Sequence, residues 1–397
     1  MNKLNLAVFN TQPPHLYFGG VERRILETGK RLGNEVNFKV YSGTKGGFHE
    51  TSSIDGVTII PCNSSDRIFP LDNWTFNRTL SKMTDKVKAD VYEAHAVSGY
   101  GFQKALRKKG IKAPFIETIH GVLADEYAQT QQRGGMSVRG KVANFFMNRL
   151  AKIENETARD ATLIVTISKY SQKKIVELYG VEPEKIRIAP NGVDPERFKP
   201  AADGCEELRR RIGTGGKRTV LFVGRLIPRK GLSYLIEAAK TVSKEYSDVL
   251  FLIVGDGPLR GQLAAEVVQA NLGSNFAFLG DVSEAELPAF YSCTDVFAFP
   301  SIQEGQGIAL LEAQASAKPV VAFKVSGVAE AVVDKETGLL VEPDAAKLAE
   351  GVLKLLGDES LRQKMGAKGR ERILRELTWD VCARNMLEVY REALQRV

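Results

Sequence analysis

Four short segments of this 397-residue chain place glycines beside charged or imidazole side chains. Each segment follows a run of β-forming residues and comes shortly before a stretch with helical spacing. In parallel α/β sheets, the loops beyond the carboxyl ends of the strands gather the ligand-binding groups. These segments therefore hold the residues that could carry chemistry, and phosphate and sugar groups are the ligands that their side chains fit.

The segment 224–231, with the sequence GRLIPRKG, places two cations in one loop. Arg225 offers a planar fork to phosphate oxygens and Lys230 offers a point charge, so the pair suits a diphosphate. Earlier in the chain, Gly19 and Gly20 precede a helix, where a backbone without side chains can approach an anion closely. The alternatives are a solvated basic loop and a tight turn.

The segment 301–312, with the sequence SIQEGQGIALLE, is the most informative. Gly305 and Gly307 open a helix whose N–H groups can cradle a phosphate. Glu304 in the loop and Glu312 two turns along the helix could each hold sugar hydroxyls. Apolar residues surround Glu312, where a charge is costly without a partner, so a functional role competes with that of a surface helix residue.

His120 follows a predicted strand and precedes a glycine, in the sequence TIHG over 118–121. A lone histidine is more often structural or simply exposed. The position of this one at the end of a strand, in a chain with only four histidines, favours a functional role instead.

Short β-forming runs alternate with helical patterns along the chain, which predicts βαβ units and parallel sheets. The predicted strands cover 4–9, 36–41, 57–60, 91–94, 115–119, 162–167 and 186–189, and then 220–223, 249–254, 276–279, 296–299, 320–323 and 339–341. Two such series predict two doubly wound domains, over 1–197 and 198–378, joined by a connector rich in Pro, Gly and Asn. A final helix over 379–397 can pack on either domain.

In this order, the four segments resemble the retaining glycosyltransferases of family 4, which have the GT-B fold. In that family an N-terminal Gly-Gly loop, a His-Gly or His-Asp pair, a G-R-x-x-x-x-K-G loop and an E-G-x-G-x-x-x-x-E element occur in the same order with similar spacing. The stretches 190–194, 254–258 and 278–280 add to a resemblance that spans nearly the whole chain. It implies an α/β protein with two Rossmann-like, doubly wound domains that face a central cleft.

The resemblance also implies a role for each residue. Arg225 and Lys230 would bind the diphosphate of a nucleotide-sugar, and Glu312 would bind its ribose. Glu304 and His120 would contact the transferred sugar. The implied catalytic set is His120, Glu304, Arg225 and Lys230, and the implied donor-binding set is Gly19, Gly20, Arg225, Lys230, Val282, Glu304, Gly305, Gln306, Gly307, Ile308 and Glu312.

Gly19 and Gly20 would close over the donor from the N-terminal domain, and Val282 would border the base together with the loop 255–258. The family often has Phe where this chain has Gln306, a departure that removes no charge but can alter contacts near the donor sugar.

The composition is that of a globular protein, with 43% hydrophobic residues and no run of about 18 apolar residues that could span a membrane. Four widely spaced cysteines form no C-x-x-C pair, so we expect neither a disulfide framework nor a zinc site, and we assign the chain to the reducing cytoplasm. The net charge of +7 comes from residues 1–200, with 30 Lys and Arg against 21 Asp and Glu, because the remainder has 25 against 27. The excess suggests an anionic partner, with a solvated basic surface as the alternative.

Other classes of protein lack their defining residues here. Lys217 follows a glycine but precedes arginine, not the Ser or Thr of a phosphate-binding P-loop. The glycines of 255–261 miss the spacing of a dinucleotide site by one residue. The basic segments mostly lack the interleaved aromatic residues of a nucleic-acid binder. Because the chain has no D-x-D sequence and no metal-ligand spacing, we predict neither a metal nor a cofactor.

The resemblance implies a retaining hexosyltransferase that moves a sugar from a UDP- or GDP-sugar to a lipid-linked or soluble acceptor. The alternative is a catalytically silent nucleotide-sugar-binding or scaffold protein of the same fold. The segment 139–153 is a basic amphipathic pattern with Phe145 and Phe146 on one face, which can lie on an anionic membrane. Packing of this stripe into the N-terminal domain is the commoner outcome for an isolated stripe.

Overall fold

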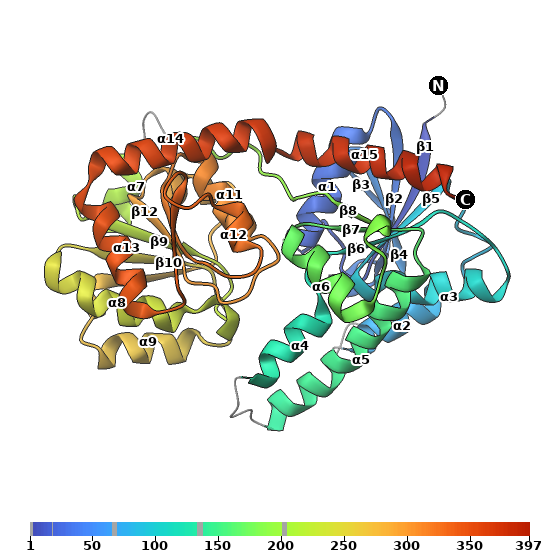
Figure 1. The fold of residues 1–397 in the computed structure, drawn as a ribbon, viewed down its shortest axis with the longest axis horizontal. Coiled ribbons are helices and arrows are strands. Elements are labelled where there is room, and N and C mark those ends of the chain that lie inside the picture. Colours follow the sequence, from blue (N-terminus) through green and yellow to red (C-terminus); the bar gives the residue numbers. More distant parts are fainter. Residues whose placement is uncertain (1–2, 18, 66–69, 133–137, 201–204) are drawn as a thin grey trace. The chain divides into compact units, whose positions relative to one another are not determined.

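The computed structural model describes residues 3–17, 19–65, 70–132, 138–200 and 205–397. The chain forms two compact units: an N-terminal unit of Met1–Asn191 with Trp379–Val397, and a C-terminal unit of Gly192–Thr378. Each unit is an open sheet with helices on both faces (Figure 1). The units divide at 191 and 192, where the boundary predicted from the sequence lies at 197 and 198.

The N-terminal unit contains an eight-stranded sheet in the order β3-β4-β2-β1-β5-β6-β7-β8. Its strands are β1 (Leu4–Asn10), β2 (Val36–Gly43), β3 (Ser52–Ile54), β4 (Val57–Cys62), β5 (Val91–His95), β6 (Phe115–Ile119), β7 (Leu163–Thr166) and β8 (Ile186–Ile188). Its α-helices are α1 (Gly20–Leu32), α2 (Leu71–Leu80), α3 (Tyr100–Lys108), α4 (Leu123–Gln132), α5 (Val138–Asp160), α6 (Lys169–Tyr179) and α15 (Trp379–Gln395). Neighbouring strands are parallel, except that the short edge strand β3, which was not predicted, runs antiparallel to β4.

Successive residues of these strands pack against opposite helix layers, as the two-residue period of a strand requires. In β7, Leu163 and Val165 join the core shared with α1 and α15, whereas Ile164 packs with α5 and α6. The last helix of the chain, α15, therefore completes a core layer of the N-terminal unit.

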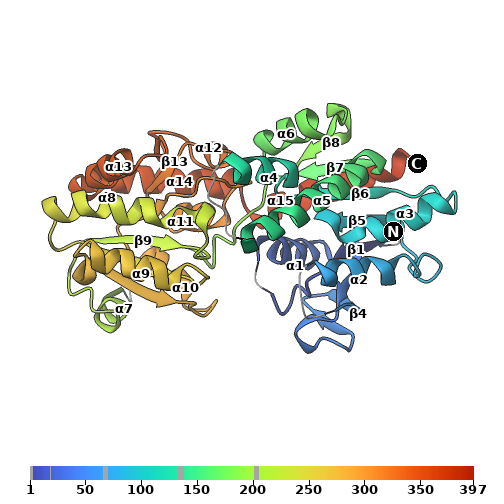
Figure 2. The same cartoon turned by 90° about the horizontal axis from the view of Figure 1, so that it is seen from below.

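The C-terminal unit contains a six-stranded parallel sheet in the order β11-β10-β9-β12-β13-β14. Its strands are β9 (Thr219–Val223), β10 (Leu250–Val254), β11 (Phe276–Gly280), β12 (Val296–Phe299), β13 (Val320–Phe323) and β14 (Gly338–Val341). Its α-helices are α7 (Cys205–Arg211), α8 (Leu232–Glu245), α9 (Arg260–Gln269), α10 (Leu287–Ser292), α11 (Ile308–Ala315), α12 (Val328–Ala331), α13 (Ala345–Gly357) and α14 (Glu359–Glu376). Helices α8, α9 and α13 cover one face, and α10, α11 and α14 cover the other (Figure 2). Each predicted strand is present, and the prediction of two doubly wound α/β domains is confirmed.

The expectation that the chain lacks a disulfide is wrong. Cys205, at the start of α7, is bonded to Cys293, which follows α10. The two cysteines are 88 residues apart and become neighbours because α7 packs against α10, a contact that sequence spacing does not reveal. Cys62 and Cys382 are free and buried.

The segment 139–153 lies on α5, and its side chains before residue 143 fall outside the described part of the chain. Phe145 is 54% exposed, with the Arg149 guanidinium 5.0 Å from its ring centre. The helix instead buries Ala151 and Glu154. The expectation that the apolar stripe of 139–153 packs into the N-terminal domain is therefore wrong for Phe145. In the described part of the chain, no helix has the length and hydropathy that a membrane span requires.

Two carboxyl groups are fully buried beneath the helices of the N-terminal unit. Glu154 accepts hydrogen bonds from the Tyr179 hydroxyl and, at 2.9 Å, from the Leu123 N–H. Burial raises the pKa of Glu154 from 4.5 to about 8, and burial beside Glu154 and Glu93 raises the pKa of Glu117 well above its ordinary value. Glu154 therefore keeps a proton near pH 6 that the unfolded chain releases.

The protonated Glu154 makes the stability of the N-terminal unit fall as pH rises. Between pH 4.5 and about 8 the folded chain holds one more proton at this position than the unfolded chain, which corresponds to about 1.4 kcal/mol per pH unit. Glu154→Gln keeps both hydrogen bonds without a titrating group. We expect it to reduce the loss of unfolding free energy per pH unit by about that amount, as measured by urea unfolding between pH 5 and pH 8. Glu156→Gln, at a half-buried position of the same helix, is the control and should keep the wild-type slope. Equal slopes for wild type and Glu154→Gln would contradict the assignment.

Candidate functional site

The loops after β9 and β12 leave adjacent strands at the point where the strand order of the C-terminal sheet reverses. The chain proceeds from β9 to β10 on one side and from β12 to β13 on the other. Ligands of open α/β sheets bind at such a switch point, beyond the carboxyl ends of the strands. The first loop turns through a 3₁₀ helix, Pro228–Lys230, and the second carries Glu304.

A glycine allows these two loops to touch. Gly231 has a φ of +66°, and a Cβ at this position would lie 2.0 Å from the carbonyl oxygen of Pro300. The carbonyl oxygen of Arg229 accepts hydrogen bonds from the Ile302 N–H at 2.9 Å and from Ser301 Oγ at 3.1 Å. The two loops are therefore held together through their backbones.

The Glu304 carboxylate collects three donors on its Oε1 atom. Lys230 Nζ forms an ion pair with it, Arg229 Nη1 lies 3.1 Å away, and Ser301 Oγ lies 2.9 Å away. Burial alone would raise the pKa of Glu304, but the charges of Lys230 and Arg229 outweigh burial and hold that pKa below its ordinary value. The carboxyl is thus ionised, and its Oε2 atom accepts no hydrogen bond from the described residues.

Lys230 and Arg225 lie in the same loop but differ in exposure and in their partners. Lys230 is only 14% exposed, and its ammonium also lies 5.1 Å from the centre of the Phe299 ring. Arg225 is exposed, and its guanidinium makes no hydrogen bond or ion pair within the described ranges. The loop therefore offers one cation held by Glu304 and one that can move toward an anion.

The second carboxylate of this segment has the partner that its apolar setting requires. Glu312 on α11 is 3% exposed, and the Tyr291 hydroxyl of α10 donates to its Oε2 atom at 2.7 Å. Gly307 precedes the helix with a φ of +87°. The adjoining Gln306 is buried, whereas Ile308, the first helical residue, is half-buried.

Val282 follows the carboxyl end of β11, at the same edge of the sheet as the loops after β9 and β12. Val282 lies between β11 and α10, and β10 separates β11 from β9 in the sheet. Its side chain packs against the core on the face covered by α10 and α11.

In the N-terminal unit, Gly19 and Gly20 lie at the start of α1, beyond the carboxyl end of β1. A Cβ on Gly19 would lie 2.3 Å from Glu22 Oε2, so the Glu22 carboxyl folds back over this turn. Asn10, at the end of β1, donates to Glu22 Oε1 at 3.1 Å, and burial raises the pKa of Glu22. The glycines therefore border a buried polar cluster.

His120 follows β6 and is paired with a second histidine, His95, at the end of the neighbouring strand β5. His95 Nδ1 lies 2.9 Å from His120 Nε2, and His95 Nε2 lies 3.5 Å from Glu93 Oε1. His95 is 3% exposed, whereas His120 is half-buried. This arrangement makes His120 the member of the pair that can meet a ligand.

Several residues of both sites were not predicted from the sequence. In the C-terminal unit these are Arg229 and Tyr291, which hold Glu304 and Glu312. In the N-terminal unit these are Glu93 and His95. The strand sequence VYEAH at 91–95 did contain a signal, because a carboxyl and an imidazole two residues apart share one face of a buried strand.

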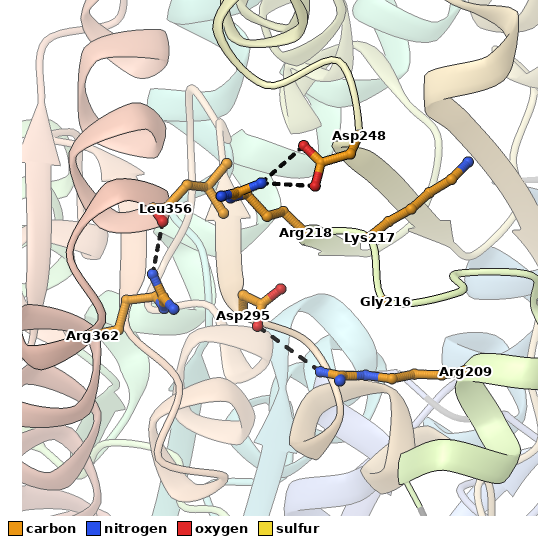
Figure 3. Close-up of a pocket in the computed structure, with 8 residues that line it drawn as sticks. All are labelled: Arg209, Gly216, Lys217, Arg218, Asp248, Asp295, Leu356 and Arg362. Atoms are coloured by element: carbon orange, nitrogen blue, oxygen red, sulfur yellow. Dashed lines mark hydrogen bonds and ion pairs between the residues drawn. The ribbon is translucent and has the colours of Figure 1, made fainter.

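A cavity of about 280 Å³ lies at the opposite end of the C-terminal sheet, where β9 and β12 begin (Figure 3). Arg218 is paired with Asp248 at 2.7 Å, and Arg209 lies 3.9 Å from Asp295. None of the predicted site residues lines this cavity. We therefore place the candidate site at the loops beyond the carboxyl ends of the strands. Among the described residues, no group of three or more His, Cys, Asp or Glu side chains could hold a metal ion.

Two family models match the chain, one described as Glycosyltransferase Family 4 over residues 18–197 and one described as Glycosyl transferases group 1 over residues 205–372. A GDP-mannose-dependent alpha-(1-6)-phosphatidylinositol monomannoside mannosyltransferase of Mycobacterium tuberculosis is 32% identical over 264 residues, which cover 64% of this chain and 68% of that protein. The chain belongs to glycosyltransferase family 4. The resemblance inferred from the four segments is thereby confirmed.

Solved structures place this family 4 chain in the GT-B fold. Sucrose-phosphate synthase from Thermosynechococcus elongatus has a TM-score of 0.84 at 21% identity, over 98% of this chain and 99% of that one. HepE from Anabaena, in complex with UDP-glucose, has a TM-score of 0.78 at 18% identity, over 98% of this chain and 100% of that one. At these identities the likeness shows the fold, and the predicted GT-B architecture of two Rossmann-like domains is confirmed.

The contact between the β9 and β12 loops can be tested at Gly231. We expect Gly231→Ala to destabilise this family 4 chain by about 2 kcal/mol or more beyond the cost of the left-handed backbone, because its Cβ would clash with a carbonyl oxygen. Gly213→Ala is the matched control, since its φ is +69° but no atom lies within 4 Å of its Cβ. Urea unfolding of both variants measures the difference, and equal losses would contradict the close approach of the loops.

Proposed function

We propose that this chain is a retaining glycosyltransferase that moves a sugar from a UDP- or GDP-sugar to an acceptor without a metal. The observation that carries the proposal is the convergence of Lys230 and Arg229 on Glu304 at the switch point of the C-terminal sheet. It combines cations, which suit a diphosphate, with an ionised carboxylate, which suits sugar hydroxyls. The names of the relatives support a nucleotide-sugar donor, because one is GDP-mannose-dependent and HepE is in complex with UDP-glucose.

The leaving diphosphate gains negative charge as its bond to the sugar breaks. We assign this charge to Arg225, Lys230 and the N–H groups at the start of α11, from Gly305 to Ile308, because prearranged donors stabilise charge that develops in a transition state. The Glu304 carboxylate holds the Lys230 ammonium in place before the donor binds. Glu312, held by Tyr291, takes the ribose hydroxyls.

The reaction proceeds on one face of the sugar. The bond between the anomeric carbon and the diphosphate oxygen breaks, the acceptor oxygen bonds to that carbon from the same face, and the acceptor proton passes to the departing diphosphate. Glu304, through Oε2, and His120 hold hydroxyls of the sugar, and no side chain bonds to it covalently. Gly19 and Gly20 leave room for the donor at the start of α1.

The acceptor is proposed to be lipid-linked or otherwise anionic. The first 200 residues carry the excess of Lys and Arg, and α5 exposes Phe145 beside Arg149. An exposed aromatic ring beside a cation suits the interface of an anionic membrane. The name of the Mycobacterium tuberculosis relative, which includes a phosphatidylinositol monomannoside, supports the same class of acceptor.

A nucleotide-release screen over UDP- and GDP-sugars tests the donor assignment. We expect turnover with at least one donor, and a loss of about 100-fold or more in kcat/KM for Glu304→Ala and Lys230→Ala, because each removes a group that contacts the donor. Asp248→Asn is the control, since it breaks an ion pair at the opposite end of the same sheet and should stay within about twofold of wild type.

The outcomes separate the two levels of this proposal. A wild-type chain that binds no nucleotide-sugar contradicts the enzymatic function. A chain that binds donors but turns none over supports the catalytically silent alternative. Turnover that both variants share with wild type contradicts only the roles of Glu304 and Lys230.

The membrane contact of α5 can be tested by cosedimentation with phosphatidylglycerol vesicles at low salt. We expect Phe145→Ser to reduce the bound fraction about fivefold or more, since an aromatic side chain contributes about 1.5–3 kcal/mol when it leaves water. Leu178→Ser is the control, because Leu178 is 41% exposed on α6 of the same unit. If wild type does not bind at low salt, the membrane contact is excluded and a soluble acceptor is favoured.

A further inference from the structure

A chain of polar side chains runs from the C-terminal helix α15 to His120. The Tyr390 hydroxyl of α15 donates to Glu93 Oε2 at 2.7 Å, and Thr118 Oγ1 donates to Glu93 Oε1 at 2.7 Å. That same Oε1 atom faces His95 Nε2, and His95 Nδ1 faces His120 Nε2. All five residues belong to the N-terminal unit, and all except His120 are at most 3% exposed.

The imidazoles of His95 and His120 are both uncharged. Burial, together with the charge of Arg24, lowers the pKa of His95 to about 3. Burial, the repulsion that a protonated His95 would exert and the charge of Arg24, in that order, hold the pKa of His120 well below its usual range. A neutral imidazole has one N–H donor and one bare nitrogen that accepts. A single proton therefore lies between the two rings, and the ring that carries it decides what His120 offers to a ligand.

We propose that Glu93 and His95 are positioning residues that fix His120 as the tautomer protonated on Nε2. From 3.5 Å, an ionised Glu93 Oε1 favours the N–H of His95 on Nε2 by electrostatic attraction. His95 Nδ1 is then bare and accepts the N–H of His120 Nε2. His120 Nδ1 is left as a hydrogen-bond acceptor, and this atom has no hydrogen-bond partner in the described part of the chain.

This proposal deepens the proposed function and rests on it for the identity of the ligand. A bare ring nitrogen recognises a hydroxyl that donates a proton, and the transferred sugar supplies such hydroxyls. The structure therefore assigns His120 the part of an acceptor, in contrast to Lys230, which can only donate.

The protonation state of Glu93 decides between two arrangements of these protons. Burial raises the pKa of Glu93, and the hydrogen bonds from Tyr390 and Thr118 oppose that rise by stabilising the carboxylate. In the reverse arrangement, a protonated Glu93 would donate to His95 Nε2, and His95 would donate to His120. His120 would then carry its proton on Nδ1. The two arrangements differ in the position of protons that can be measured directly.

Nitrogen-15 NMR of the full chain with labelled histidine distinguishes protonated from bare ring nitrogens and needs no substrate. We expect His120 to show a protonated Nε2 and a bare Nδ1 near pH 7, with its signals assigned by their loss in His120→Gln. A protonated Nδ1 on His120 overturns the proposal, whatever the activity of the enzyme.

Substitutions at position 95 provide a matched series for activity. The Asn carbonyl oxygen falls near the place of the imidazole Nδ1, the Gln amide reaches toward the place of Nε2, and Phe has no acceptor. We expect His95→Asn to keep kcat/KM for nucleotide release within about threefold of wild type, and His95→Gln and His95→Phe to lose about tenfold to a hundredfold. Equal losses for all three variants at equal melting temperature overturn the positioning role.

The two readouts separate this proposal from the proposed function. If the NMR signals show the expected tautomer while His120→Gln releases nucleotide as fast as wild type, the role of His120 toward the sugar fails and the positioning chain stands. If nucleotide release depends on His120 but the proton lies on Nδ1, the proposed function stands and the positioning chain fails.

Discussion

The ion pair between Lys230 and Glu304 is the constraint on which the candidate site of the C-terminal unit depends. Both side chains are mostly buried, and either charge alone would be costly there. Removing one partner of such a pair typically costs about 3–5 kcal/mol, because the other charge stays buried without compensation. Gly231, which follows Lys230, lets the loop approach Pro300 closely, so the glycine and the charges are parts of one arrangement.

The same ion pair decides which atoms of the site stay available to a ligand. Because Lys230, Arg229 and Ser301 all use the Oε1 atom of Glu304, its Oε2 atom stays available to a hydroxyl donor. Arg225 adds an exposed cation on the same loop. The candidate site of the N-terminal unit works differently, because burial there keeps the imidazoles uncharged. One unit therefore offers fixed charges and the other offers neutral hydrogen-bonding groups.

The sequence predicts single site residues better than their partners. Lys230 and Glu304 could be found because each follows a strand. Their pairing depends on β9 lying next to β12, an order of strands that no local pattern contains. Arg229 was missed for that reason, and the disulfide between Cys205 and Cys293 was missed because it depends on how two helices pack.

The strands, too, could be predicted where a local pattern marks them and were missed where it does not. Each predicted strand is present because a buried parallel strand is a continuous apolar run, which needs no knowledge of its neighbours. Short edge strands such as β3 have no such run. The exposure of Phe145 could not be predicted either, because α5 buries the face that carries Glu154, whose partners are the Tyr179 hydroxyl and the Leu123 N–H.

Arg24, a buried cation, links the two segments at which the chain leaves and re-enters the N-terminal unit to the candidate site of that unit. The guanidinium of Arg24 is 1% exposed and donates to the Ala189 carbonyl oxygen at 2.8 Å, to Asn191 Oδ1 at 3.0 Å and to Met386 Sδ at 3.0 Å. Arg24 therefore fixes both the last residues before the chain leaves this unit and the helix with which the chain returns. Its charge also lowers the pKa of both histidines. The return of α15 is thus tied twice to His120, through the field of Arg24 and through the Tyr390 hydroxyl on Glu93.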